Sequence, residues 1–288
     1  MCRADLRIVL GLYRSRHERE LLETALELGV RAIDTSYNYL GFASHRTLAR
    51  VAGDLLPEFT ISTKVGFFPN GEGGEHSLEP ARLRQAIEDT AEQLSGPPAV
   101  VLLHNPERTL SGLSEPEGQY RLFGALETLQ KASQLKLCDG WGISTWDPRP
   151  LLMVLTAGAH AVPLPDVVMT RAGLLVSVGV LDAAEELAVR LGVAEEARWG
   201  MSPFGGHADA QVWRMVDCRT FLAASQECSN LQAAFRLAYE LPRVGRVAVS
   251  TNSRGHLRQL AEATRLQVDE DILARYRELL RSHRPTRG

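Results

Sequence analysis

Eight short apolar segments alternate with longer amphipathic segments along this chain of 288 residues. Short apolar runs are typical of strands buried in a parallel sheet, whereas leucines and alanines that recur every three or four residues indicate helices. The predicted strands cover residues 7–12, 31–34, 59–63, 99–103, 140–144, 166–170, 198–201 and 246–250. Eight successive βα units predict an α/β fold, a single (β/α)8 TIM barrel, with residues 1–288 forming one domain.

Helix signals in the sequence support this alternation. Residues 17–28 and 79–94 have helical patterns, and Gly29 stands where a helix C-cap is expected. After the sixth strand the connection begins with an apolar, glycine-containing stretch, which places its helix at 181–191. The segment 202–228 is long for a connection, and long connections in compact folds are often functional.

The composition favours an enzyme-sized globular protein that does not bind nucleic acid. Hydrophobic residues make up 44% of the chain and the formal net charge is -3, which suits a large core and argues against a nucleic-acid surface. The four cysteines, Cys2, Cys138, Cys218 and Cys228, have neither metal-ligand spacing nor a disulfide pattern. The first residues lack an apolar signal segment, and no apolar run approaches the ~18 residues of a membrane span. We therefore expect a cytoplasmic monomer without metal, disulfide or membrane partner.

Four polar residues stand at or just beyond the ends of three successive predicted strands. Asp34 ends the second strand, and Tyr39 follows it. Lys64 follows the third strand and His104 the fourth. Taken singly, such residues are more often helix caps, packed rings or solvated charges. In a (β/α)8 barrel, however, residues after the strands meet at the C-terminal face, where active sites are built, so these four side chains are expected to converge.

Together these four side chains can transfer a proton. A phenol has an unperturbed pKa of ~10, so it needs a neighbouring cation that favours the phenolate if it is to act near neutral pH. Lys64 can supply that charge, and Asp34 can hold the lysine in place. His104 can donate a hydrogen bond to a substrate oxygen. Tyr37 competes with Tyr39 for the role of acid because it lies only two residues away.

The motif D-T-x-x-x-Y, followed by a strand ending in T-K and a strand ending in L-H-N-P, resembles the aldo-keto reductase superfamily. The resemblance covers nearly the whole chain, from a first strand ending in G-L-Y to an eighth ending in S-T-N. It implies a reductase of a small-molecule carbonyl substrate, with Tyr39 as proton donor, Lys64 and Asp34 tuning it, and His104 orienting the carbonyl. It also implies NADPH as cofactor, with NADH as the alternative.

For the nicotinamide ring, the resemblance points to the ends of the fifth, sixth and seventh strands. Ser144 and Thr145 stand where the family usually has Ser-Asn. Met169 replaces a glutamine, and Met201, followed by Ser202, replaces an aromatic residue. A methionine can lie against an aromatic ring but cannot replace the hydrogen bonds of an amide. These positions therefore predict an atypical nicotinamide pocket.

For the adenosine end, the resemblance points to the start of the eighth helix. The residues there are Ser250, Thr251, Asn252, Arg254 and Arg258. Hydroxyls, helix N-terminal amides and arginines hold phosphate groups, so we expect this region to bind the 2'-phosphate that distinguishes NADPH from NADH. Each of these residues could instead be a helix cap or a solvated charge.

The substrate and the direction of the reaction stay open at the level of sequence. The glycine-rich segment 69–76 and the L-H-N-P motif resemble the branch of the family that oxidises free sugars. Candidate contacts for a sugar are Asn105, Arg171, His207 and Asp209. The alternatives are an NAD(P)-dependent sugar dehydrogenase that uses the same residues in reverse, and a non-redox barrel that serves as a binding or regulatory protein. The segment 69–76 is either a lip over the site or a surface excursion.

Overall fold

The computed structural model describes residues 7–71, 73–156 and 162–282. Eight parallel strands close into a barrel in which each strand pairs with its neighbours in chain order, and the last strand pairs with the first. The strands are β1 Ile8–Gly11, β2 Ala32–Asp34, β3 Thr60–Val65, β6 Val100–His104, β7 Gly140–Thr145, β8 Val167–Arg171, β9 Arg198–Met201 and β10 Arg246–Ser250. The predicted (β/α)8 TIM barrel is confirmed.

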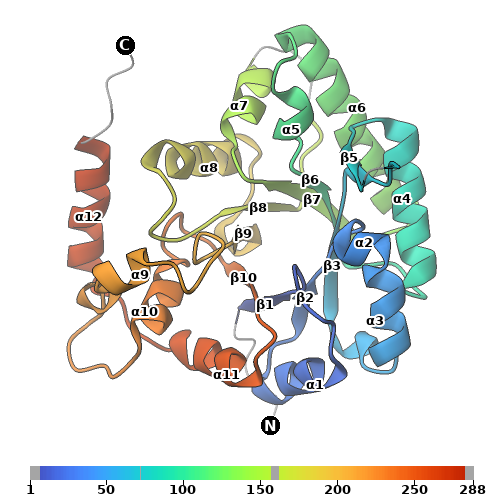
Figure 1. Cartoon of the computed structure of the whole chain (residues 1–288). Helices are drawn as coiled ribbons and strands as arrows, with labels where there is room; N and C mark the ends of the chain where they lie inside the picture. Colours follow the sequence, from blue (N-terminus) through green and yellow to red (C-terminus); the bar gives the residue numbers. More distant parts are fainter. Residues whose placement is uncertain (1–6, 72, 157–161, 283–288) are drawn as a thin grey trace.

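Helices surround the barrel on its outside (Figure 1). The longer ones are α1 Arg19–Leu28, α3 Ser44–Ala52, α4 Pro80–Gln93, α6 Glu115–Gln134, α7 Arg149–Thr156, α8 Val178–Arg190, α10 Asn230–Leu237, α11 Arg254–Ala263 and α12 Glu270–Ser282. The short ones are α2 Tyr39–Phe42, α5 Glu107–Leu110 and α9 Val212–Met215, with 3-10 turns η1 Leu56–Glu58, η2 Glu195–Ala197 and η3 Cys218–Phe221. An antiparallel hairpin of β4 Phe67–Phe68 and β5 Glu75–His76 follows β3.

The helix boundaries follow local signals in the sequence. Gly29 ends α1 with a φ of 88°, a left-handed conformation that glycine adopts without steric cost. Pro80 occupies the first turn of α4, where its missing N–H is not needed. The helix α8 begins at Val178 instead of Leu181, and Val180 is already part of its buried face, which packs with Leu181 and Trp213.

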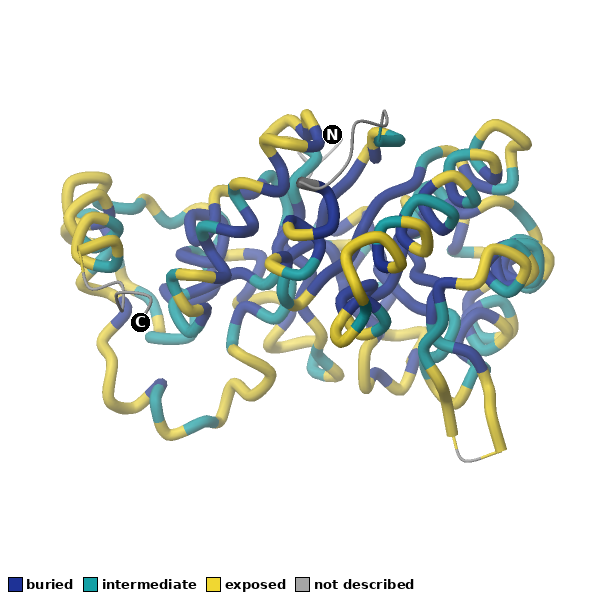
Figure 2. The backbone as a smooth tube through the Cα atoms, turned by 90° about the horizontal axis from the view of Figure 1, so that it is seen from above, coloured by how far each residue is buried: buried dark blue, intermediate teal, exposed yellow. Residues whose placement is uncertain are grey.

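The strand side chains alternate between the barrel interior and the helix layer. Residues that fill the interior are Val9, Ala32, Leu102, Val167, Met169, Trp199 and Ala248. Their neighbours along the strands pack outward against the helices. Figure 2 shows the result as buried strands inside a shell of helices whose outer faces are exposed. Because side chains fill the interior, a ligand can reach the strands only at their ends.

The carboxyl ends of the strands carry the predicted catalytic residues. Asp34 is the last residue of β2, Lys64 lies next to the last residue of β3, and His104 is the last residue of β6. These three strands are adjacent and parallel, so their ends open on the same face of the barrel. We call this face the mouth.

Three further sequence expectations concern cysteines, metals and membranes. Cys138, Cys218 and Cys228 are free thiols, and Cys2 lies outside the described residues. Over the described ranges, no group of three or more His, Cys, Asp or Glu side chains is arranged to hold a metal ion. None of the described helices combines the length and apolar character that crossing a membrane requires.

The closeness of β7 to β8 yields the first prediction. A Cβ atom at Gly142 would lie 2.1 Å from the Val167 carbonyl oxygen and 2.7 Å from Leu102 Cδ2. We expect Gly142→Ala to lower the free energy of unfolding by about 3 kcal/mol, because the strands must separate to admit the methyl group. Gly124→Ala is the control: its Cβ in α6 would meet nothing closer than Pro80 Cγ at 3.5 Å, so it should stabilise by about 0.5–1 kcal/mol. Denaturant unfolding measures both, and a neutral Gly142→Ala would contradict the packing described here.

Candidate active site

A buried ion pair lies at the centre of the mouth. Lys64 Nζ donates a short hydrogen bond to Asp34 Oδ2, and the side chains are only 3% and 6% exposed. The same ammonium donates to the Thr35 carbonyl oxygen at 3.1 Å. The other carboxylate oxygen accepts a hydrogen bond from Ser62 Oγ at 2.9 Å. The pair is therefore fixed in place, as the sequence predicts for Asp34 holding Lys64.

Tyr39 lies beside this ion pair. The centroid of its ring is 5.5 Å from Lys64 Nζ and 6.4 Å from the ring of His104. Tyr37 points elsewhere, because its hydroxyl donates to Asp89 Oδ2 on α4 at 2.8 Å. The geometry thus separates two tyrosines that the sequence leaves in competition: only Tyr39 lies with the ion pair and His104.

The backbone turns sharply directly after Tyr39. Leu40, Gly41 and Phe42 have φ angles of 50°, 59° and 68°, so α2 is a left-handed turn. Such a conformation costs residues other than glycine roughly 1–2 kcal/mol each, and local strain of this kind clusters at functional sites. The left-handed turn therefore begins directly after Tyr39, within the candidate site.

The phenol of Tyr39 is held in its protonated form. Burial raises the pKa of Tyr39 well above its ordinary value, and the charge of Asp34 and the neighbouring Tyr13 act in the same direction. The sequence leads us to expect that Lys64 favours the phenolate, but in this structure burial and Asp34 outweigh that effect. Tyr39 therefore has a proton to donate at neutral pH.

His104 is buried and neutral. It is 8% exposed, and burial lowers the pKa of His104 well below its ordinary value, with the charges of Lys64, His76 and Arg108 acting in the same direction. Its Nδ1 lies 3.1 Å from Ser36 Oγ. A neutral imidazole is uncharged, so it can orient a carbonyl oxygen by a hydrogen bond but cannot compensate a developing negative charge as a cation would.

Residues 73–76 of the glycine-rich segment lie against the candidate site through His76, which belongs to β5 of the hairpin. His76 Nε2 lies 2.7 Å from the carbonyl oxygen of His104, and its Nδ1 lies 2.7 Å from Thr109 Oγ1. The ring of Phe67 packs edge-on against His104, with centroids 4.8 Å apart. The hairpin is thus attached to the catalytic candidate His104.

The residues expected to hold the nicotinamide lie together but face into the protein. Ser144, Thr145 and Met169 have no exposed surface. The Thr145 hydroxyl donates to Glu107 at 2.8 Å, and Ser144 Oγ lies 3.8 Å from Met201 Sδ. Met201 is partly exposed, as is the residue that follows it, Ser202, which has a φ of 56°. Among the five, Met201 and Ser202 are therefore the ones with surface at the mouth.

The residues expected at the adenosine end lie at the end of β10 and the start of α11. Ser250, Asn252, Arg254 and Arg258 are exposed, and Thr251 is partly exposed. Asn252 is already engaged, since its amide accepts from Arg16 N at 2.9 Å and donates to the Arg14 carbonyl at 3.2 Å. Arg254 pairs with Glu20 at 3.1 Å. Exposed hydroxyls, guanidinium groups and the first amides of a ten-residue helix fit a phosphate group.

Sequence comparison identifies the family. A model of the aldo/keto reductase family matches residues 9–170, which is more than half of the chain. The chain belongs to the aldo/keto reductase family. It is accordingly an NAD(P)H-dependent oxidoreductase, and the resemblance seen in its sequence motifs is confirmed.

Individual relatives agree with the family assignment. The pyridoxine 4-dehydrogenase of Escherichia coli (strain K12) is 26% identical over 271 residues, which cover 92% of this chain and 88% of the relative. Aldo-keto reductase AKR11C1 from Bacillus halodurans (holo form) has a TM-score of 0.71 at 16% identity, covering 95% and 91% of the two chains. An aldo-keto reductase from Klebsiella pneumoniae in complex with NADPH has a TM-score of 0.64 at 16% identity, covering 98% and 92%. At these identities the two structures show the fold alone.

Glu107 is a buried residue of this aldo/keto reductase that sequence reasoning missed. It is 7% exposed and accepts hydrogen bonds from Thr145 Oγ1 at 2.8 Å and from the Trp146 amide at 2.7 Å. Burial raises the pKa of Glu107, while these hydrogen bonds oppose the rise. No motif in the sequence marks a single glutamate after Asn-Pro as functional, because its hydrogen-bond partners lie at the end of another strand, β7. Glu107 joins the ends of β6 and β7 beneath the mouth.

Two polar groups at the mouth have atoms without a hydrogen-bond partner. Asn105 is 8% exposed and its Oδ1 is unpaired, and the buried Nε of Arg171 is also unpaired. The Arg171 guanidinium lies over the ring of Trp146 at 5.2 Å. The other two candidate sugar contacts, His207 and Asp209, are exposed. Asn105 and Arg171 therefore have the unmet hydrogen-bonding capacity that a polar ligand could use.

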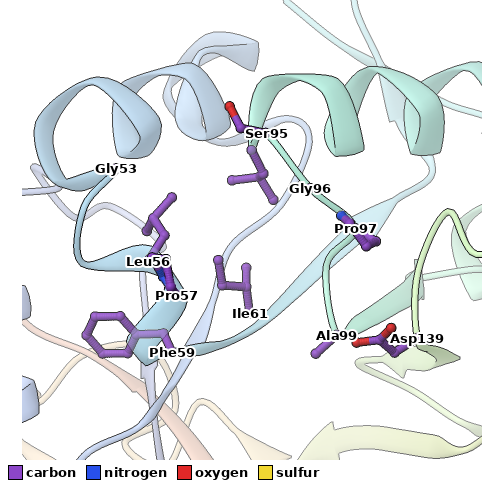
Figure 3. Close-up of a pocket in the computed structure, with 11 residues that line it drawn as sticks. Gly53, Leu56, Pro57, Phe59, Ile61, Ser95, Gly96, Pro97, Ala99 and Asp139 are labelled. Carbon is purple, nitrogen blue, oxygen red and sulfur yellow. The ribbon is translucent and has the colours of Figure 1, made fainter.

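The pocket in Figure 3 lies at the opposite end of the barrel. It has a volume of about 330 Å³, and its lining includes Phe59 and Ile61 at the start of β3 and Asp139 before β7. In (β/α)8 barrels the chemistry takes place at the carboxyl ends of the strands, whereas the opposite face serves stability. We therefore assign this pocket no part in the reaction.

A second polar network, also missed from the sequence, lies behind the ion pair. His17 Nε2 is 2.6 Å from Ser44 Oγ, which is 2.6 Å from Thr35 Oγ1. His45 Nε2 is 2.8 Å from Thr63 Oγ1. The two threonines adjoin the two partners of the ion pair along the chain, so this network fixes the backbone on both sides of the pair.

The histidines of this network predict how stability depends on pH. Burial lowers the pKa of His45 to about 4, and the charge of His17 acts in the same direction. The unfolded chain binds a proton at His45 near pH 6.5, whereas the folded chain does not until about pH 4. The contribution of His45 is therefore constant above pH 6.5, and stability falls as the pH drops from 6.5 to 4, by about 3 kcal/mol for this residue.

Replacing His45 tests this account. We expect His45→Gln, whose amide can still bond to Thr63, to reduce the loss of stability between pH 6.5 and 4, as measured by denaturant unfolding at several pH values. Arg258→Gln, a change at an exposed position of α11, is the control and should leave the slope intact. An unaltered slope in His45→Gln would mean that other groups govern acid stability.

Proposed function

We propose that this aldo/keto reductase reduces an aldehyde or ketone to an alcohol with NADPH, using Tyr39 as the general acid. The observation that carries the proposal is the position of Tyr39 beside both the buried Asp34–Lys64 pair and the neutral His104 at one mouth. A protonated phenol, a fixed cation and an uncharged imidazole are the groups that protonation of a carbonyl oxygen requires.

The roles of the residues follow from their positions. When bound, NADPH supplies the hydride that adds to the carbonyl carbon. Tyr39 gives its proton to the carbonyl oxygen, and the Lys64 ammonium, 5.5 Å from the ring, stabilises the charge left on the phenol oxygen. Asp34 holds Lys64 in place, and His104 orients the carbonyl by a hydrogen bond. The same groups act in reverse when an alcohol is oxidised, with Tyr39 accepting the proton.

NADPH is favoured over NADH by the basic residues at the start of α11. Arg254 and Arg258 are exposed next to the helix N-terminus, where a 2'-phosphate would find both guanidinium groups and backbone amides. The relative from Klebsiella pneumoniae was crystallised with NADPH, which agrees with this preference. At the other end of the cofactor, Met201 and Ser202 are the residues that would contact the nicotinamide.

The substrate we propose is a polar aldehyde. The unpaired atoms of Asn105 and Arg171 and the exposed face of Trp146, which is 41% exposed, lie at the ends of β6, β7 and β8. Because the Escherichia coli relative is a pyridoxine 4-dehydrogenase, the first compounds to test are pyridoxine and its 4-aldehyde. Aldose sugars come next, since the oxidation of a sugar would use the same residues. A purely non-redox role is disfavoured by membership of a reductase family together with the complete set of Asp34, Tyr39, Lys64 and His104.

The catalytic proposal is tested by a matched pair of tyrosine variants. Tyr39→Phe should lower kcat for carbonyl reduction by at least about 10²-fold, because the proton donor is lost, while the Kd for NADPH stays nearly unchanged. Tyr37→Phe removes the hydroxyl bound to Asp89 and should leave kcat nearly unchanged. Reduction is followed by the loss of absorbance of the reduced nicotinamide. Full turnover by Tyr39→Phe would refute the assignment.

The cofactor proposal is tested at the start of α11. Arg258→Ala and Arg254→Ala should each weaken NADPH binding by about tenfold or more and spare NADH, because one charge-assisted hydrogen bond contributes about 1.5–3 kcal/mol. Glu20→Gln is the control: it releases Arg254 from its ion pair and should not weaken NADPH. Fluorescence titration with both cofactors gives the Kd values. An equal loss for NADPH and NADH would place these arginines on the shared part of the cofactor.

A further inference from the structure

The imidazole of His104 meets a buried hydroxyl that has three acceptors within reach. Its Nδ1 lies 3.1 Å from Ser36 Oγ, and Ser36 has no exposed surface. The same hydroxyl oxygen lies 2.6 Å from the side-chain amide oxygen of Asn38 and 3.3 Å from the Lys64 carbonyl oxygen. A hydroxyl has a single proton to donate. The acceptor that takes the hydroxyl proton therefore determines which ring nitrogen of His104 carries the imidazole proton.

The possible arrangements of these hydrogen bonds fall into two classes, which differ in the ring nitrogen of His104 that carries the proton. When Ser36 donates to the amide oxygen of Asn38 or to the Lys64 carbonyl oxygen, its own oxygen accepts from His104 Nδ1–H, and Nε2 is left as an acceptor. When the amide is turned by half a rotation, its NH2 donates to Ser36, and Ser36 donates to Nδ1. His104 then carries its proton on Nε2. Only the second arrangement lets Nε2 donate a hydrogen bond to a carbonyl oxygen.

His104 stays neutral and does not become an imidazolium with a proton on both ring nitrogens. The charged or titratable groups that face it are Lys64 from β3, His76 from β5 and Arg108 from α5, with Tyr39 edge-on from α2. No carboxylate is among these groups, and within the described part of the chain burial and the neighbouring charges all disfavour an imidazolium. A neutral imidazole has one N–H, and its partner at Nδ1 decides whether Nε2 donates or accepts.

We propose that Ser36 and Asn38 select the tautomer of His104, with the side-chain amide of Asn38 as the element that turns. The proposal rests on the proposed function, in which His104 faces the reacting oxygen. The arrangement in the structure, with the amide oxygen toward Ser36, suits an alcohol, which donates to Nε2. The turned arrangement suits a carbonyl, which accepts from it. Ser36 and Asn38 are thus positioning residues that act through His104.

The decisive variant is Asn38→Asp. A carboxylate only accepts, so it fixes the Ser36 proton and leaves Nε2 as an acceptor. We expect kcat for carbonyl reduction at neutral pH to fall by about 10²-fold, the usual cost of losing one donor to the reacting oxygen, with the Kd for NADPH unchanged. Activity should return as the pH is lowered, since a protonated carboxyl group can donate to Ser36 and so let Ser36 donate to Nδ1. In the unsubstituted protein, kcat should not rise in this way as the pH is lowered.

Truncation at the same position is the control. In Asn38→Ala the Ser36 hydroxyl keeps only the Lys64 carbonyl oxygen, at 3.3 Å, and His104 Nδ1, at 3.1 Å, as acceptors. Nδ1 can then take the hydroxyl proton, so kcat should fall by less than tenfold and without the new pH dependence. A purely structural role predicts the reverse order, because aspartate has the shape of asparagine and alanine does not. A larger loss of kcat in Asn38→Asp than in Asn38→Ala would therefore support the proposal, and the opposite order would overturn it.

A double variant tests whether Ser36 carries the effect. In the Ser36→Ala background the amide has no hydroxyl through which to reach His104. Asn38→Asp should then change kcat by less than about threefold, where in the parent background we expect about 10²-fold. An equally large loss in both backgrounds would show that the carboxylate acts directly on Tyr39 or Lys64, and would overturn the relay.

The tautomer can also be read without any substrate. In protein labelled with 15N at histidine, long-range proton–nitrogen spectra distinguish Nδ1–H from Nε2–H, and the signals of His104 are those lost in His104→Asn. Asn38→Asp should hold His104 in the Nδ1–H form, and finding Nε2–H there would overturn the proposal. Failure of every carbonyl compound in the activity assay would count against the proposed function, whereas this spectrum decides the tautomer independently.

Discussion

The mouth of this barrel depends on one ion pair that is removed from water. Withdrawing an ammonium and a carboxylate from water costs several kcal/mol for each ion, and their attraction offsets that cost only when further hydrogen bonds complete the site. Here Lys64 also donates to the Thr35 carbonyl, and Asp34 also accepts from Ser62. Removing either partner would leave an uncompensated buried charge, which typically costs about 3–5 kcal/mol. Apolar residues would stabilise the strands more simply, so the pair is best understood through its effect on Tyr39.

The other titratable groups near the pair are kept neutral by burial. Tyr39 retains its proton, and His104, His45 and His17 stay uncharged, since burial opposes the charged form in every case. The ion pair, together with Arg108 beside His104, therefore sets the local field, and the neutral groups contribute directed hydrogen bonds. In the proposed mechanism, this division explains how a phenol can remain a proton donor at neutral pH beside an ammonium that stabilises the phenolate once the proton has left.

Membership of the aldo/keto reductase family accounts for the barrel and for the catalytic set better than for the cofactor contacts. The hydroxyl of Thr145 is bound to Glu107, and Met169 belongs to the barrel core, so neither side chain is free for an amide of the nicotinamide. In the proposed binding mode the ring is held through fewer side-chain hydrogen bonds and more apolar contact, with Met201 at the surface. At the adenosine end the exposed arginines and the start of α11 keep the features of a phosphate site.

The sequence by itself determined the barrel and the four residues at its mouth. Strand positions follow from short apolar runs, and parallel strands bring Asp34, Lys64 and His104 to one face by topology alone. The barrel and this grouping of residues can therefore be predicted from the sequence. Tertiary structure decided the rest. It separated Tyr39 from Tyr37 through Asp89 on a distant helix, turned Thr145 toward Glu107, and joined Ser36 and Asn38 to His104. These contacts depend on the direction in which side chains leave neighbouring strands and turns, and neither residue type nor spacing encodes that direction.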